Sequence, residues 1–288
     1  MVRRFLINPI ESGDLMQIDL NKESAGDSIE KQKEHFESIA LLYYEARQSL
    51  NSILYKEKLW EHIFGFLPPA GKRGQLTVLE AMCGYAEGEK IVKKHYNLNV
   101  QYTGFDYSQN LIDSVKQRYP EKDVFVQDVT KFRPQMQYDL ILIIGGLHHV
   151  HEFTEDVLNN LKYGLKDSGY LINFEPTHGN RIMQAIRDRI YRKSSFIDYE
   201  TERDYHVNEL NNIYAVSGFD VVWQFSPGLL AYCLYYNPDI FPRLAKINSS
   251  VLKILFAIEK PFFRTRIARF FSFATLSVLQ RQKVGLPK

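Results

Sequence analysis

The chain has 288 residues, 45% of them hydrophobic and 24% charged, which is enough to bury one large core in one or two domains. Because 36 Lys and Arg face 34 Asp and Glu, the net charge of +2 gives no general field for nucleic acid or an anionic membrane. Two cysteines, Cys83 and Cys233, exclude a disulfide framework and a cysteine-rich zinc site.

A polar lead opens the chain, and from about 28 to 66 apolar and aromatic residues repeat at helical spacing. The first residues hold only a short apolar run, which is not typical of a signal peptide. No apolar stretch approaches the roughly 18 residues that span a bilayer. We therefore expect a cytoplasmic protein in which residues 1–70 form a lead and an N-terminal helical lid.

Strands and helices are expected to alternate through the middle of the chain. Five short β-branched runs separated by amphipathic segments predict strands at 77–81, 100–106, 124–129, 138–146 and 170–175. Ser108 and Thr154 are placed to cap two of the helices, and Asp167-Ser168-Gly169 predicts a turn before the fifth strand. This order is typical of an α/β fold with a doubly wound, Rossmann-like, mostly parallel sheet.

The pattern changes after the fifth strand. Helices are expected at 183–193 and 206–219, the second ended by Gly218, and the apolar runs 220–225 and 229–236 indicate strands. We expect the core domain to cover 71–236, a helical insertion to cover 237–270, and 271–288 to return as the last strand of the core.

The loop after the first strand, within LEAMCGYAEG, carries small residues at alternate positions: Gly84, Ala86 and Gly88. Small residues let a backbone approach a ligand, and the helix that follows offers unpaired N–H groups. Glu80 stands before the glycines, where its charge would repel a pyrophosphate. This argues against NAD and for a nucleoside that carries an amino acid.

Acidic residues also close the next two strands. Asp106 ends the second strand, 22 positions after Gly84, where a carboxylate can accept hydrogen bonds from both hydroxyls of a ribose. Asp128 closes the third strand beside the same crevice, because ligands of such sheets bind beyond the carboxyl ends of the strands.

From about 75 to 175 the chain resembles the class I S-adenosylmethionine-dependent methyltransferases. The likeness is carried by VLEAMCGYAEG, FDYSQNLI, VFVQDVTKF, YDLILIIGGLHHV and LKDSGYLINFEP. It implies S-adenosyl-L-methionine as the cofactor, whose methionine part would lie near Glu80, Gly84 and Ala86. It also implies the ribose on Asp106, the adenine beside Tyr107, Asp128 and Val129, and the methionyl group against Gly145.

The family usually has glycine where this chain has Met82, and often where it has Ala86. We expect the Met82 side chain to point away from the cofactor and its backbone to keep a negative φ. A Met82 that closes the loop would instead leave a cofactor-binding scaffold without turnover.

The resemblance implies methyl transfer to a small molecule by in-line displacement, with oxygen as the expected acceptor atom. Transfer to nitrogen or carbon, or to a lipid or saccharide intermediate, is the alternative. The candidate groups for removing a proton are Glu175, His149 and His148. The candidates for substrate binding are Tyr43, Arg47, His178 and Arg203. No metal is expected, because His148 and His151 lack a set of carboxylate partners.

The segment from Arg243 to Arg269 holds seven Lys or Arg and one acid, Glu259, among apolar residues. It predicts a packed helical insertion, and peripheral membrane contact is the alternative reading. No nucleic-acid partner is expected, because no known binding module accompanies the charge. A homodimer stays open.

Overall fold

A computed structural model describes residues 31, 33–34, 37–39, 41–42, 44–45, 47–67, 74–96, 99–192, 203–237, 243 and 248–283. The strands are β1 (Gln75–Ala81), β2 (Asn99–Asp106), β3 (Val124–Val126), β4 (Tyr138–Ile144), β5 (Leu165–His178), β6 (Tyr205–His206), β7 (Phe219–Phe225) and β8 (Ala274–Arg281). The helices are α2 (Leu50–Phe64), α3 (Gly88–His95), α4 (Gln109–Arg118), η1 (Leu147–Phe153), α5 (Thr154–Tyr163), α6 (Arg181–Tyr191), α7 (Val207–Val216), α8 (Leu230–Tyr235), α9 (Ser249–Glu259), η2 (Lys260–Phe262) and α10 (Arg266–Phe271).

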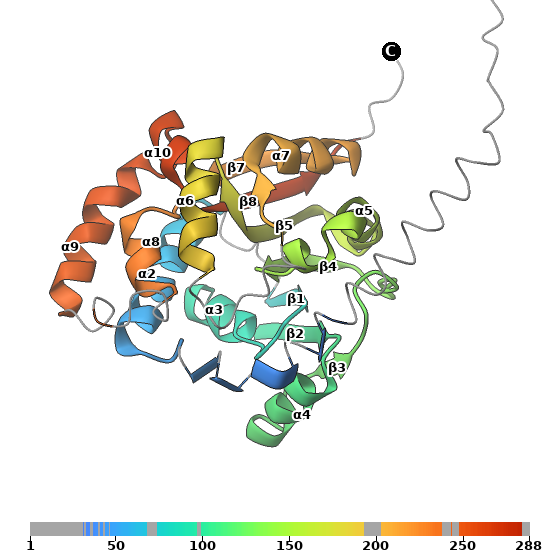
Figure 1. Ribbon diagram of the computed structural model, residues 1–288. Helices are drawn as coiled ribbons and strands as arrows, with labels where there is room; N and C mark the ends of the chain where they lie inside the picture. Colours follow the sequence, from blue (N-terminus) through green and yellow to red (C-terminus); the bar gives the residue numbers. More distant parts are fainter. Residues whose placement is uncertain are drawn as a thin grey trace, which may run out of the picture.

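One twisted sheet organises these elements in the order β3-β2-β1-β4-β5-β8-β7, and β6 pairs with the end of β5 (Figure 1). Strands β1 to β5 pair in parallel, whereas β8 runs antiparallel between β5 and β7. The predicted doubly wound α/β fold is confirmed, and helices α9 and α10 form the expected insertion before the last strand.

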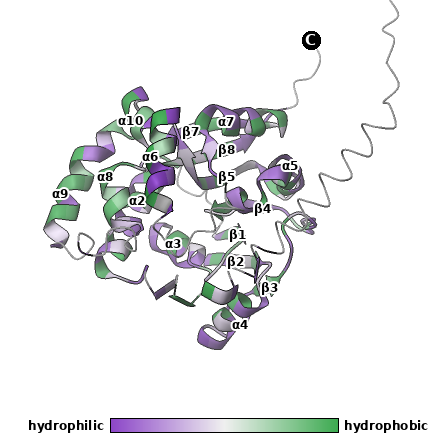
Figure 2. Ribbon diagram, viewed as in Figure 1, coloured by the Kyte–Doolittle hydropathy of each residue, from purple (hydrophilic) through white to green (hydrophobic). Residues whose placement is uncertain are grey.

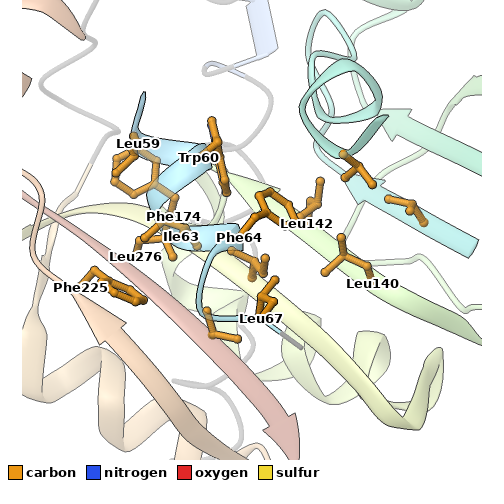
Figure 3. Close-up of a cluster of buried hydrophobic side chains, with 14 of the residues drawn as sticks. Leu59, Trp60, Ile63, Phe64, Leu67, Leu140, Leu142, Phe174, Phe225 and Leu276 are labelled. Atoms are coloured by element: carbon orange, nitrogen blue, oxygen red, sulfur yellow. The ribbon is translucent and has the colours of Figure 1, made fainter. Parts of the chain in front are cut away.

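Both faces of the sheet are buried, as continuous apolar strands require. In β4, Leu140 and Leu142 face a cluster that includes α2, α3 and α8, while Ile141 and Ile143 face a cluster that includes α5 and α7. Figure 3 shows the first cluster, in which Leu59, Trp60, Ile63 and Phe64 of α2 lie against side chains of β4, β5, β7 and β8. The N-terminal helix is thus held on the sheet beside the carboxyl ends of its strands.

Three local predictions were wrong. Residues 229–236 were expected as a strand, but they contain α8, whose Ala231, Tyr232 and Tyr235 are buried in the α2 cluster. Thr154 does not cap α5: it is the first residue of the helix, and its hydroxyl donates to the carbonyl of His151 at 2.9 Å. Asp167-Ser168-Gly169 lie inside β5, where the pairing with β4 shifts register instead of turning.

Two other caps were predicted correctly. The Ser108 hydroxyl accepts a hydrogen bond from the N–H of Leu111, and Gly218 follows α7 with a φ of +78°. Within the described ranges, no helix has the length and hydropathy needed to cross a membrane.

Candidate functional site

A cleft lies at the carboxyl ends of β1, β2 and β4, between the sheet and the N-terminal helical residues. It encloses about 1040 Å³, counted out to the solvent. Its lining residues are Tyr44, Arg47, Gln48, Lys56, Trp60, Glu80, Met82, Cys83, Gly84, Tyr85, Glu87, Ile91, Asp106, Tyr107, Leu111, Ile144, Gly145, Gly146, His149 and Tyr236. A smaller hollow shares Met82, Tyr107 and His149 with the cleft and adds Gln127, Asp128, Val129 and Val150.

The loop between β1 and α3 bends through three left-handed residues at alternate positions. The φ angles are +57° at Met82, +51° at Gly84 and +56° at Ala86. The N–H of Cys83 donates to the carbonyl of Phe105 at 2.8 Å, and the N–H of Ala86 donates to the carbonyl of Cys83 at 2.8 Å. These bonds fix the turn although a non-glycine residue at positive φ costs about 1 kcal/mol or more.

Met82 therefore corrects the prediction of a negative φ. Its φ is positive, and its half-buried side chain packs against the apolar cluster that includes α5 and α7, with its sulfur beside Gly146. Room for it exists because Gly146 has no side chain: a Cβ there would lie 2.8 Å from the Met82 sulfur. A glycine in the neighbouring strand end thus compensates for the missing glycine in the loop.

Asp106 is 4% exposed, and its carboxylate connects the loop after β1 to the start of α4. One carboxylate oxygen accepts from the N–H of Gly84 at 2.9 Å, and the other accepts from the N–H of Ser108 at 3.0 Å. Burial raises the pKa of this carboxyl, and the hydrogen bonds from Ser108 and Gly84 oppose that shift. A backbone hydrogen bond from Tyr107 adds to these, and Asp106 lines the cleft.

Glu80 fixes the start of α3. Its carboxylate accepts from the N–H of Gly88 at 3.0 Å and from the Tyr102 hydroxyl at 2.5 Å. A Cβ at Gly88 would lie only 2.6 Å from the Glu80 carboxyl group, so a larger residue there would displace this carboxyl group. Burial raises the pKa of Glu80 to about 7, against the effect of both hydrogen bonds.

Two tyrosines that the sequence did not mark as site residues, Tyr44 and Tyr85, line the cleft together. The rings of Tyr44 and Tyr85 lie 4.1 Å apart, and the Arg118 guanidinium lies 4.9 Å from the centre of the Tyr44 ring. These residues come from three separate segments, so no local spacing marks them. The predicted Arg47 also lines the cleft and donates to Asn237 at 3.0 Å. Its predicted partner Tyr43 lies outside the described residues.

Glu175 and His148 lie behind the cleft wall and do not line it. The Glu175 carboxylate accepts from the N–H groups of Gly146 at 3.1 Å and Leu147 at 2.9 Å, and it lies 2.8 Å from Nδ1 of His148. Burial raises the pKa of Glu175 to about 8 and lowers that of His148 to about 3, so this imidazole is neutral near pH 7. The geometry favours an anchor for η1 over a base at the reacting atoms. His149 does line the cleft, and its ring centre lies 3.9 Å from that of His148.

Three further predicted residues lie away from the cleft lining. Nδ1 of His178 is 2.7 Å from Asp204, and Arg203 pairs with Glu209 at 2.8 Å on an exposed surface. Ala86 was expected beside the cofactor, but its side chain is buried in the core because the left-handed turn points it inward.

The cleft thus brings together seven predicted residues: Glu80, Gly84, Asp106, Tyr107, Gly145, His149 and Arg47. Asp128 and Val129 line the adjoining hollow. Among residues that the structure describes, no group of three or more His, Cys, Asp or Glu could hold a metal ion.

Comparisons with known proteins indicate a methyltransferase domain. A family model described as a methyltransferase domain matches residues 78–169, which hold β1, β2, β3 and β4 and the start of β5. A malonyl-[acyl-carrier protein] O-methyltransferase of Ilyobacter polytropus is 27% identical over 124 residues, covering 42% of this chain and 44% of that protein. The match therefore spans less than half of that relative.

Solved structures share the fold at low sequence identity. The O-methyltransferase from a trans-AT polyketide synthase multienzyme of Brevibacillus brevis, in complex with S-adenosylhomocysteine, has a TM-score of 0.51 and 16% identity. That likeness covers 78% of this chain and 72% of the other. A cyclopropane synthase of Mycobacterium tuberculosis has a TM-score of 0.53 and 17% identity, covering 80% of this chain and 84% of the other.

Proposed function

Because this chain belongs to the class I S-adenosylmethionine-dependent methyltransferases and uses S-adenosylmethionine as its cofactor, we propose that it methylates an oxygen atom of a small molecule. The observation that carries the proposal is the placement of His149 in a cleft that also holds Asp106 and Glu80. Among the three predicted proton acceptors, only His149 lines that cleft.

The residues of the cleft fit the cofactor. Asp106 lines the cleft, and its carboxylate would accept hydrogen bonds from the two ribose hydroxyls. A Cβ on Gly84 would meet no atom within 4 Å, so the loop leaves open space above its backbone. The lining carries three carboxylates, Glu80, Glu87 and Asp106, and two cations, Arg47 and Lys56. This balance suits a ligand with an ammonium, a sulfonium and one carboxylate.

When bound, S-adenosylmethionine supplies an electrophilic methyl group whose transfer leaves a neutral thioether. Trp60 and Tyr236 line the cleft and would exclude water from the reacting atoms. His149 would accept the proton of a hydroxyl acceptor. Glu175 and His148 would act as positioning residues, because they hold the turn that carries His149.

Two of the similar proteins are named as O-methyltransferases, which supports oxygen as the acceptor atom. Methylation at nitrogen or carbon, or of a lipid or saccharide intermediate, is the second candidate. The rival of another class is a scaffold that binds the cofactor without turnover. The observation that favours this rival is that Met82 lines the cleft at a loop position where the family usually has glycine.

Transfer of a labelled methyl group to a panel of hydroxyl, carboxyl and amino compounds tests the proposal. We expect a methoxy product or a methyl ester, identified by mass spectrometry and NMR. With a hydroxyl acceptor, His149→Ala should lower kcat about 100-fold or more and leave cofactor affinity unchanged. His151→Ala is the matched control, because His151 lies on the same turn outside the cleft lining. A methyl group on nitrogen or carbon would contradict the proposal, and binding without any product would favour the scaffold.

A further inference from the structure

The insertion before β8 carries an unusual surface, which we call the α9–α10 face. Seven large apolar side chains expose 44–64% of their area there: Val251, Ile254, Ile258, Phe262, Ile267, Phe270 and Phe271. Figure 2 shows the hydrophobic colouring along α9 and on α10 at the edge of the molecule. Scattered apolar residues are normal on a surface, but a concentration on two consecutive helices indicates a binding site.

Helix α9 is apolar on two opposite sides. Leu252 and Phe256 are buried, and the Phe256 ring packs 5.8 Å from the ring of Tyr55 in α2. Val251, Ile254 and Ile258, spaced by three and four residues, point to solvent on the other side. Packing on the core requires only one apolar stripe of a surface helix. The second stripe therefore serves contact with something outside the chain.

Positive charge surrounds these apolar side chains. Lys253, Lys260, Arg264 and Arg266 are all exposed. Glu259 is the one acid between 248 and 272 in the sequence, and it is buried with its carboxylate accepting from the N–H of Ala231. The α9–α10 face thus presents cations without an exposed acid.

Helix α6 continues the same surface. The Asn180 side chain, which caps α6, donates to the carbonyl of Phe270 in α10 at 2.7 Å, so the two helix ends are neighbours. Ile182 and Ile186 of α6 are 65% and 41% exposed, and Arg181 and Arg189 are exposed beside them. The combination of apolar and cationic side chains is therefore repeated on an adjacent helix.

We propose that the α9–α10 face docks on an anionic lipid bilayer. The apolar side chains enter the boundary between headgroups and acyl chains, while Lys and Arg pair with lipid phosphates. The contact is peripheral, since no described helix could cross the bilayer. Charge decides against a second copy of the chain, because a two-fold contact would bring two cationic faces together.

Vesicle sedimentation tests the proposal, using phosphatidylcholine alone and phosphatidylcholine mixed with phosphatidylglycerol. We expect the chain to bind the mixed vesicles, to release them as salt rises, and to bind the neutral vesicles at least tenfold more weakly. Two double variants should each weaken binding about tenfold or more. One removes apolar contact, Ile254→Gln with Ile258→Gln, and the other reverses charge, Lys253→Glu with Arg266→Glu.

The controls change equally exposed positions elsewhere. The control for the apolar double variant is Leu50→Gln with Val216→Gln, because both side chains are similarly exposed. The control for the charge-reversing double variant is Lys116→Glu with Lys283→Glu, which changes the net charge by the same amount. The controls should bind like the unaltered chain, and all variants should keep its unfolding midpoint. Absence of binding to anionic vesicles, or equal losses in the controls, would overturn the proposal. A dimer that the Ile254 and Ile258 changes dissociate would assign the face to a second copy and would also overturn it.

Discussion

Replacing Asp106 with alanine should weaken cofactor binding through the ribose. In the structure the Asp106 carboxylate accepts backbone N–H groups from Gly84 and Ser108, with a further one from Tyr107, and it lines the cleft, where both ribose hydroxyls would donate to it. Two charge-assisted hydrogen bonds to the ribose hydroxyls are therefore lost together. Their combined contribution is about 2 to 4 kcal/mol, which corresponds to a Kd about 30- to 700-fold higher.

Isothermal titration with S-adenosylhomocysteine measures this change. Asp123→Ala is the matched control, because the Asp123 carboxylate accepts from the Thr103 hydroxyl of β2 and does not line the cleft. A second ligand that lacks the ribose 2′-hydroxyl separates the ribose contact from damage to the loop. The unaltered chain should prefer the complete ligand, and Asp106→Ala should lose most of that preference. An unchanged preference in the variant would refute the assignment of Asp106 to the ribose.

Three further changes probe the cleft and its supports. Burial raises the folded pKa of Glu175 to about 8, so stability should fall as pH rises from about 5 to about 8, on the order of 1 kcal/mol per unit. Glu175→Gln should flatten that dependence of the unfolding midpoint, and an unchanged slope would contradict the raised pKa. Met82→Ile should lower the free energy of unfolding by about 1 kcal/mol more than Met82→Leu, because a branched side chain opposes a φ of +57°; equal losses in urea titrations would count against this reasoning. Ser108→Ala should cost about 1 kcal/mol through the lost cap of α4, and Ser114→Ala in the same helix should cost much less.

The sequence predicts the strand ends of the cleft well because each is marked by local chemistry. A β-branched run followed by a small or acidic residue identifies the ends of β1 and β2, and these bring Glu80, Gly84 and Asp106 to one place. Parallel strands share one carboxyl edge, so these two separate motifs converge without any knowledge of side-chain packing.

Features that depend on distant partners could not be predicted in this way. The positive φ of Met82 is tolerated because Gly146, 64 positions later, leaves room for the side chain. Residues 229–236 show no clear period and were assigned to a strand, but contact with α2 and α9 makes them helical. Glu175 looked like a pocket residue because it ends the predicted strand 170–175, whereas the N–H groups of the turn after β4 occupy its carboxylate.

The position of β8 sets an order on the synthesis of this sheet. Strands β2 to β5 can each pair as soon as they emerge from the ribosome, because each has a partner that is made before it. Strand β2 pairs with β1, β3 with β2, β4 with β1, and β5 with β4. Strand β7 has no such neighbour: in the sheet its partner is β8, which is made about fifty residues later. A ribosome-bound chain that stops before Ala274 should therefore hold β7 as an unpaired edge, open to proteases and to strands of other chains. Once residues 274–281 leave the ribosome, they can form β8, which pairs with β5 on one side and β7 on the other. Protection of β7 from proteolysis should therefore appear abruptly at that chain length.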